Sequence, residues 1–332
     1  MNKTLQAWAV GAAMATMLAH PVAALADDAA PLKISSEASI KGTQTVVVGA
    51  FNVGFIFSSI DNTKTTGGMI GAFGGTTKAK SELVGVTPAM MQAITDAAYA
   101  DFQAQLAARG FTVADAAGMF AHADFARVKM MQAPYEASIQ LDKKSNGKAT
   151  YFKPSALPGQ FMLPGDITAS GMSGIGLNMS MGTNQYGVTQ YSKAAGQSVI
   201  DVVYLIDFSD VKRPGAFSFG GGLNVNSGMS VVDDYSKLNL VNTAGKTATI
   251  IFKEPVAVEG DFAAMEDTTK GGGVQKAANI LGGLAAAKGF GGLKFGKTKT
   301  FTFTAKPDYE QGAIKAATLA NTRLVEQLAA LK

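Results

Sequence analysis

Residues 45–57 have the sequence TVVVGAFNVGFIF, a run of β-branched and aromatic residues without a single charge. Such a run is typical of a strand that is buried on both faces of a sheet. A second run of the same character, SVIDVVYLIDF, covers residues 198–208. The two runs predict two core strands that are widely separated along the chain.

The segments around these strands predict helices. Thr87 and Pro88 supply an N-cap and a first-turn proline, and apolar residues then recur every three or four positions until Gly110. A second, weaker helix is predicted over residues 120–131. The last helix begins after Pro307, and its apolar stripe comprises Ile314, Ala317, Asn321, Leu324, Leu328 and Leu331.

The remaining segments predict shorter strands and long loops. Residues 111–114 and 297–305 are expected to be strands, and residues 229–241 and 247–252 are expected to form a hairpin. Glycine and proline predict loops over residues 58–81 and 142–198. The fold expected is therefore α+β: a mixed, mostly antiparallel sheet packed by two or three amphipathic helices, with long Gly-rich loops.

The N-terminus has the pattern of a secretory signal. Lys3 precedes an apolar run, and Ala24-Leu25-Ala26 provides a small-x-small cleavage site. We therefore predict a signal peptide over residues 1–26, a disordered lead over 27–42 and a single α+β domain over 43–332. A subdivision near residues 142–198 is the alternative. The predicted location is the periplasm of a Gram-negative bacterium, with association with the outer membrane as a further expectation.

The composition excludes several kinds of functional site. The 332 residues include no cysteine, and His122 is the only histidine after the predicted signal. Thiol nucleophiles, thiolate metal sites, lipidation at cysteine and multi-histidine sites are thereby excluded. A net charge of +4 gives no nucleic-acid footprint. We expect no enzymatic activity, no cofactor, no metal and no nucleic-acid partner.

Three motifs bear on these expectations. Residues 291–298, GGLKFGKT, match the phosphate-loop pattern but stand between a predicted helix and a predicted strand, the reverse of its usual context. His122, with Asp115 and Asp124 nearby, is a candidate general base, although a structural helix histidine is the favoured interpretation. A group of carboxylates lacks the spacing of a calcium loop and is expected to be exposed turn charges: Asp233, Asp234, Glu259, Asp261, Glu266 and Asp267.

A predicted helix over residues 273–289 is the candidate contact surface. Its apolar face is flanked by lysines, which would suit a membrane interface or a protein partner. The alternative is a core helix of the same sheet. The contact residues predicted for this face are Ala277, Ile280, Leu281 and Leu284.

A group of methionines suggests a second function. Met162, Met172, Met179 and Met181 fall within the predicted loop-rich region. Methionine side chains adapt to irregular apolar surfaces, so this group could form the mouth of a site for a lipid or another apolar small molecule.

A resemblance to known domains lies in the order of the elements and in two segments, SVIDVVYLIDF and LNLVNTAGKTATIIF (residues 238–252). In these features the chain resembles the periplasmic α+β domain of the curli-secretion channel family and the N-terminal domain of TolB-like proteins. Val241 to Lys246 carry the likeness. The resemblance implies an α+β domain that assembles with other envelope components, and it implies no catalytic residue.

These observations predict a non-enzymatic exported envelope protein. It would act through self-association or through binding an envelope protein partner, in secretion or in outer-membrane biogenesis. Contact with a membrane surface is a further expectation. The alternatives are a periplasmic binding protein for an apolar small molecule and, third, an envelope hydrolase built around His122.

Overall fold

The computed structural model describes residues 32–65, 75–142, 145–167, 172–212, 224–269 and 298–332. The described strands join in one 13-stranded sheet. Its strands are β1 (Leu32–Ser35), β2 (Thr45–Thr65), β3 (Gly75–Val84), β4 (Thr112–Ala114), β5 (Tyr135–Asp142), β6 (Ser145–Phe152), β7 (Ser198–Lys212), β8 (Asn224–Val231), β9 (Lys237–Val241), β10 (Thr247–Phe252), β11 (Val256–Val258), β12 (Ala263–Asp267) and β13 (Thr298–Ala305).

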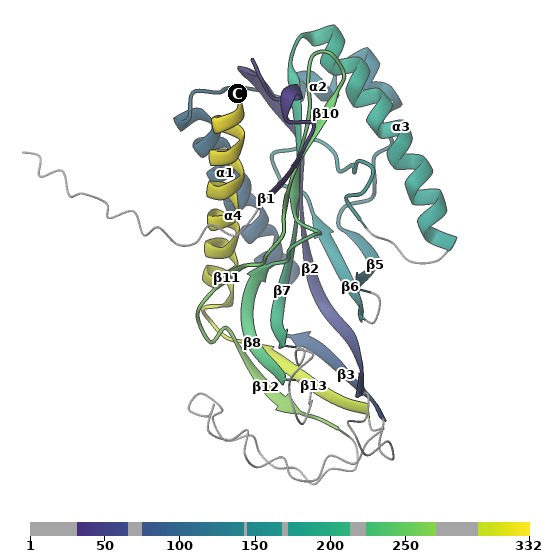
Figure 1. Cartoon of the computed structure of the whole chain (residues 1–332), viewed down its shortest axis with the longest axis vertical. Helices are drawn as coiled ribbons and strands as arrows, with labels where there is room; N and C mark the ends of the chain where they lie inside the picture. Colours follow the sequence, from purple (N-terminus) through teal and green to yellow (C-terminus); the bar gives the residue numbers. More distant parts are fainter. Residues whose placement is uncertain (1–31, 66–74, 143–144, 168–171, 213–223, 270–297) are drawn as a thin grey trace, which may run out of the picture.

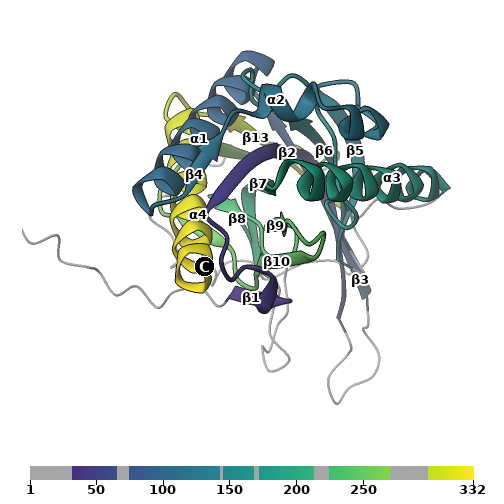
Figure 2. The same cartoon turned by 90° about the horizontal axis from the view of Figure 1, so that it is seen from above.

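Four α-helices accompany this sheet in the described part of the chain. They are α1 (Pro88–Ala108), α2 (Ala116–Phe120), α3 (Met172–Ala195) and α4 (Tyr309–Leu331), and two short 3₁₀ helices are η1 (Glu37–Ser39) and η2 (Ala123–Arg127). The sheet lies between the α1–α4 pair on one side and α3 on the other (Figures 1 and 2). The predicted α+β fold is confirmed.

The sheet is mixed, as predicted. The long central strand β2 pairs in parallel with β7 and β4, and β3 pairs in parallel with β13. The other pairings are antiparallel, including the predicted β9–β10 hairpin. Gly245 in the turn of this hairpin has a φ of 76°, a left-handed conformation that glycine adopts without strain.

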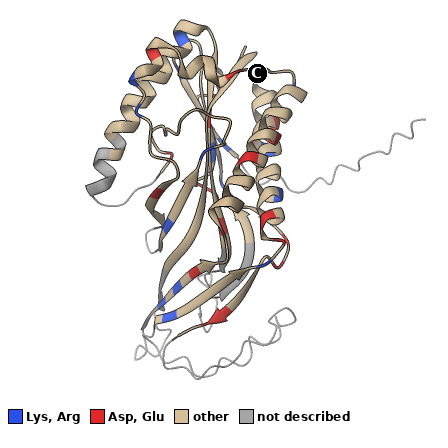
Figure 3. Cartoon of the chain, turned by 180° about the vertical axis from the view of Figure 1, so that it is seen from behind, with Lys and Arg blue, Asp and Glu red and all other residues tan. Residues whose placement is uncertain are grey.

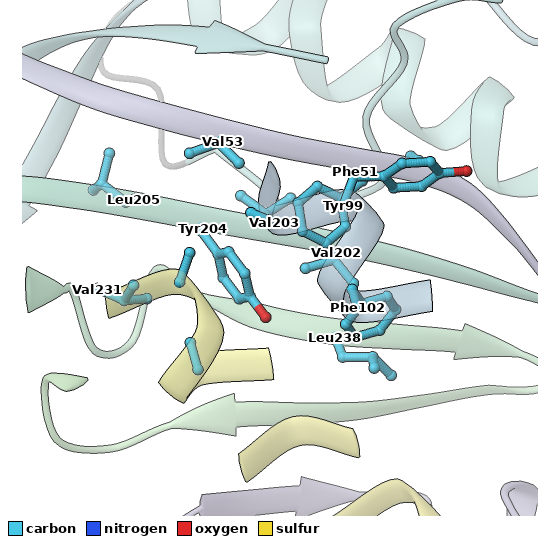
Figure 4. Close-up of a cluster of buried hydrophobic side chains, with 14 of the residues drawn as sticks. Phe51, Val53, Tyr99, Phe102, Val202, Val203, Tyr204, Leu205, Val231 and Leu238 are labelled. Atoms are coloured by element: carbon cyan, nitrogen blue, oxygen red, sulfur yellow. The ribbon is translucent and has the colours of Figure 1, made fainter. Parts of the chain in front are cut away.

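The core lies where β2 and β7 meet α1 and α4. The Phe51 ring lies 5.6 Å from each of the rings of Tyr99, Phe102 and Tyr204, and all four side chains are buried (Figure 4). The predicted helices α1 and α4 are both present, and Thr87 caps α1 by accepting a hydrogen bond from Met90 N at 3.2 Å. The predicted buried runs are thus the centre of the fold.

A polar group joins the two helices to the sheet inside this core. Asn321 of α4 donates from Nδ2 to Ala98 O at 2.9 Å and to Asp101 Oδ2 at 2.7 Å. Its Oδ1 accepts the Tyr204 hydroxyl hydrogen bond at 2.7 Å. One buried amide therefore connects α4, α1 and β7, and its own polar atoms are satisfied.

Two predicted irregular segments are ordered elements instead. The predicted disordered lead over 27–42 contains β1, in which Leu32 pairs with Phe252 of β10, and η1. The predicted loop over 58–81 is wrong because β2 continues to Thr65 and β3 begins at Gly75. In both cases backbone pairing with a neighbouring strand outweighs weak local propensity.

Three further boundaries differ from the predictions. The loop-rich region over 142–198 contains β6 and the 24-residue helix α3. The helix predicted over 120–131 is replaced by α2 and η2. The strand predicted over 229–241 is two strands, because β8 ends at Val231 and β9 begins at Lys237.

Candidate functional site: a methionine-lined groove

The predicted contact residues Ala277, Ile280, Leu281 and Leu284 lie outside the described residues, as does the helix predicted over 273–289. Residues 291–297 of the phosphate-loop match also lie outside them, and Thr298 is the first residue of β13. The interpretation of both segments stays a prediction.

His122 is the N-cap of η2. Its Nδ1 accepts a hydrogen bond from Asp124 N at 3.3 Å, and its ring contacts the Tyr191 ring edge-on at 5.2 Å. Asp115, the other carboxylate considered as an orienting group, accepts from Ala117 N as the N-cap of α2. His122 and Asp115 therefore each have a capping role in this part of the chain.

The grouped carboxylates do not converge on one point. Asp234 pairs with Lys253, Asp261 with Lys306, and Asp267 with Lys299. Over the described ranges, no three histidine, aspartate or glutamate side chains gather as metal ligands do. Three of the six carboxylates thus belong to separate ion pairs rather than to one cluster.

A groove of about 710 Å³ separates α3 from the chain segment that leads into β5. This segment comprises residues 129–136, and it forms one wall of the groove. The apolar side chains of both walls include four methionines. The lining residues are Lys129, Met130, Met131, Gln132, Pro134, Tyr135, Glu136, Met162, Leu177, Ser180, Met181 and Asn184.

Asn184 holds three parts of the groove together. Its Oδ1 accepts from Lys129 N at 2.7 Å, and its Nδ2 donates to Lys129 O at 3.3 Å and to Met162 O at 3.0 Å. Both amide atoms are thus used by backbone groups, which is the usual requirement for a buried polar side chain. The groove is consequently a built feature rather than a gap between loosely placed segments.

A second amide pair fixes the floor. Gln160 donates from Nε2 to Asn52 Oδ1 and to Tyr151 O, each at 3.1 Å, and Asn52 donates to Phe161 O at 3.0 Å. Gln160 O in turn accepts from Met131 N at 2.7 Å. This network ties the segment before Met162 to β2 and β6, so the floor belongs to the rigid sheet.

Helix α3 crosses η2 closely because of a glycine. A Cβ atom at Gly187 would lie 2.7 Å from Val128 Cγ2, whereas a Cβ at Gly182, nearer the start of the same helix, would have no neighbour within 4 Å. Gly187 is therefore required by close packing, and Gly182 faces open space.

Large apolar side chains are exposed at the groove and on the outer face of α3. Met130, which lines the groove, is 45 % exposed. Met179 is 73 % exposed and Tyr186 is 50 % exposed, and helical spacing places both on the face of α3 opposite Leu177, Met181 and Asn184. The Arg127 guanidinium lies 5.9 Å from the centre of the Tyr186 ring, a cation–π contact. Helix α3 carries one charged residue, Lys193, and Figure 3 shows that most of this helix is uncharged.

The free edge of the sheet meets the groove at β5. This strand pairs with β6, and no second strand neighbour occurs among the described residues. Its first residues, Tyr135 and Glu136, line the groove. In an edge strand, alternate backbone groups point away from the partner strand and are open to another extended chain.

Four buried polar side chains close to the groove are not among the site residues predicted from the sequence. Asp166 and Asp201 are buried, and Asn239 donates to both, at 3.1 and 2.9 Å respectively. Lys237 Nζ lies 3.7 Å from Asp166 Oδ1. Aspartate is rarely buried, but Asp201 within SVIDVVYLIDF was a visible signal, because it interrupts an otherwise apolar strand.

The structure brings two of the four predicted methionines together at the groove. Met162 and Met181 line the groove, Met179 lies exposed on α3, and Met172 is the first residue of α3. Met130 and Met131 complete the lining and were not predicted. The groove can accept an apolar side chain, an apolar small molecule or an extended peptide, and its polar atoms are mostly engaged in holding its walls.

No family model, no curated protein and no solved structure matches this chain. Among the helices of the described part, none combines the length and the apolar character that crossing a membrane requires. The geometry of the chain is therefore the basis for its functional interpretation.

Proposed function

We propose that this chain is a non-enzymatic, exported envelope protein that binds a protein partner through the methionine-lined groove. The observation that carries the proposal is the groove itself, whose walls are fixed by Asn184 and whose lining leaves Met130 exposed. Apolar side chains exposed to water cost free energy unless another surface covers them.

The occupant we propose is an extended apolar segment of the partner. The edge of β5 offers backbone hydrogen-bonding groups, and the opposite wall offers the adaptable side chains of Leu177 and Met181. Lys129 at one end of the lining favours a partner that places a carboxylate there. The partner class is an envelope protein, involved in secretion or in outer-membrane biogenesis, or a second copy of this chain.

Export is supported by the signal-like pattern of residues 1–26. We place the protein in the periplasm of a Gram-negative bacterium, associated with the outer membrane. The resemblance to the curli-secretion and TolB-like domains is consistent with this placement and remains a hypothesis.

Site-specific photocrosslinking in the producing cell tests the proposal. A photoreactive residue at Met130 should give a defined crosslinked band, and the same residue at Leu319 on α4 is the control, since Leu319 is also exposed and apolar but α4 lies on the other side of the sheet. Crosslinks from position 319 with none from position 130 would contradict the proposal.

The groove volume favours one alternative function. A volume of about 710 Å³ lies within the usual range of sites for small molecules. The alternative is therefore a periplasmic binding protein for a lipid or another apolar small molecule. Native mass spectrometry of the purified protein would support it by showing a stoichiometric co-purifying mass, which Met181→Glu should abolish. A ligand-free monomer would argue against it.

A further inference from the structure

Two buried carboxyl groups lie next to each other close to the groove. Asp166 is 2 % exposed and Asp201 is 1 % exposed, and Asn239 Nδ2 donates to both, at 3.1 and 2.9 Å, which holds them side by side. Asp201 Oδ1 is buried and faces no hydrogen-bond donor among the described residues. Since an ionised carboxylate can only accept, Asp201 becomes a donor to the neighbouring Asp166 carboxylate only when it carries a proton.

The surrounding charges favour a single proton on the pair. Lys237 of β9 is the cation that faces it, with Nζ 3.7 Å from Asp166 Oδ1 and a hydrogen bond to Gly165 O. Tyr151 of β6 is the other titratable neighbour of Asp166, and burial keeps the pKa of its hydroxyl above the usual range. One lysine can balance one carboxylate, so a second negative charge in this dry site would be uncompensated.

Burial has the same effect on the titration of both carboxyl groups. It raises the pKa of Asp166 to about 6, against the opposing effect of Lys237. Burial and then the nearby charge of Asp166 raise the pKa of Asp201 well above its usual range. Because Lys237 faces Asp166, Asp201 is the group that retains the proton.

We propose that Asp201 donates a shared proton to Asp166 and thereby clamps residues 163–167 to the sheet, so that the groove is firm when the proton is present and loosens when it is lost. This regulation of the groove rests on the proposed function, whereas the clamp itself does not. On deprotonation the Asp201 O–H bond breaks, the proton passes to solvent base, and two carboxylates remain beside one lysine.

The clamp reaches the groove through the backbone. Asp166 Oδ2 accepts from Leu163 N at 2.5 Å, and Asp166 N donates to Leu163 O at 3.1 Å. The preceding residue, Met162, lines the groove and is held by Asn184 of α3. Loosening residues 163–166 therefore frees the point at which the floor of the groove is joined to α3.

The direction of the pH effect follows from proton binding. The native pair binds a proton that two unfolded aspartates would release above about pH 4. The clamp is therefore complete at low pH and is lost as pH rises through the raised pKa of the pair. The groove is expected to be firmer at mildly acidic pH than at alkaline pH.

Amide hydrogen exchange of the purified full-length protein tests the clamp. The protection of the Leu163 and Asp166 amides, corrected for the intrinsic exchange rate, should fall about tenfold or more between about pH 5 and pH 8. Asp201→Asn supplies a donor that does not titrate, so its profile should be flat. Protection that does not change with pH in the native sequence would overturn the proposal.

Two further measurements remove the alternative explanations. Since histidine side chains change charge between about pH 5 and pH 8, His122→Gln is the control, and it should keep the native profile. If His122→Gln abolishes the pH dependence, the clamp is not its source. The ¹³C carboxyl shifts of Asp166 and Asp201 need no variant: one carboxyl should remain protonated at about pH 6, and two ionised carboxyls at that pH would overturn the proposal.

The proposal for the clamp and the proposal for the groove can be refuted independently. Exchange in the isolated protein reports on the clamp alone, and crosslinking from position 130 reports on the partner. A pH-dependent clamp without crosslinks would support the clamp but reject its role in regulating partner binding. Crosslinks together with a pH-independent clamp would support the proposed function and reject the regulation.

Discussion

The two sides of the sheet are covered by helices of different character. On one side, α4 buries Ala313, Ala317 and Leu324 against α1 and the sheet. On the other side, α3 is held by the Asn184 amide and by close packing at Gly187, and it leaves Met179 exposed. Figure 2 shows the α1–α4 pair and α3 on opposite sides.

This difference separates stability from binding. A face on which small and branched residues interdigitate gains stability from burial. Helix α3 buries one face, with Met181, Val188 and Tyr191 in the core, but the groove beside it leaves Met130 available to a partner. Substitutions on the α1–α4 side should therefore lower the free energy of unfolding, whereas those at exposed residues of the groove should alter binding.

The largest effect is expected at Phe102. Its ring is buried in α1 and contacts the Phe51 ring at 5.6 Å. Phe102→Ala should lower the free energy of unfolding by about 3–5 kcal/mol, because it removes apolar contacts and leaves a cavity. Denaturant unfolding measures this change. A loss below about 1 kcal/mol would show that the α1–α4 side is not the tightly packed one.

A smaller loss is expected at the amide that joins the two helices. Asn321→Ala leaves the buried Tyr204 hydroxyl and Asp101 without their Asn321 hydrogen bonds. We expect a loss of about 2–3 kcal/mol in the same unfolding measurement. Thr322→Ala is the matched neighbour and should change stability by less than about 0.5 kcal/mol. Equal effects of the two variants would contradict the account of Asn321.

Two glycines of α3 provide a matched pair. Gly187→Ala places a Cβ against Val128 and should cost about 1–2 kcal/mol through overpacking. Gly182→Ala meets open space and should stabilise the helix by about 0.5–1 kcal/mol. Thermal unfolding monitored by circular dichroism distinguishes them. Stabilisation by both substitutions would show that α3 does not pack closely on η2.

The buried carboxyl pair should make stability depend on pH. Asp201→Asn should be more stable than the native sequence by about 1 kcal/mol at about pH 8 and nearly equal to it at about pH 4. The sign follows because burial raises the pKa of Asp201, so ionisation at high pH opposes folding. Melting temperatures across this range measure the difference, and a variant that is less stable at every pH would argue for a purely structural role.

The smallest effect on stability is expected at an exposed residue of the groove lining. Met130→Ser should change the free energy of unfolding by less than about 0.5 kcal/mol, since the side chain is exposed. The same variant should weaken partner capture in the producing cell. A destabilised Met130→Ser protein would place this residue in the core and would remove the contrast between the two sides.

The side of the sheet that α1 and α4 cover is predicted well from the sequence. The uncharged run at 45–57 and the periodic residues of α1 and α4 carry strong local signals, and the structure confirms these elements. The β9–β10 hairpin was predicted by its turn glycine. In these segments local propensity and tertiary packing favour the same structure.

The side of the sheet that α3 covers is predicted poorly from the sequence, for a physical reason. Glycine, serine and asparagine between residues 172 and 195 favour turns locally, yet this segment is the helix α3. Its close contact with η2 at Gly187 depends on residues distant in sequence, so no local pattern reports it. The groove likewise brings residues 129–136, 162 and 177–184 together, and the methionines were its one local signal.

Methionine footprinting tests the central contrast most directly. In purified protein, a mild oxidant should modify Met130 and Met179 rapidly and leave the buried Met91 and Met119 unmodified. In intact producing cells, the account predicts that Met130 becomes protected because a partner covers the groove, whereas Met179, on the outer face of α3, stays reactive. Equal oxidation of Met130 in cells and in the purified protein would contradict it.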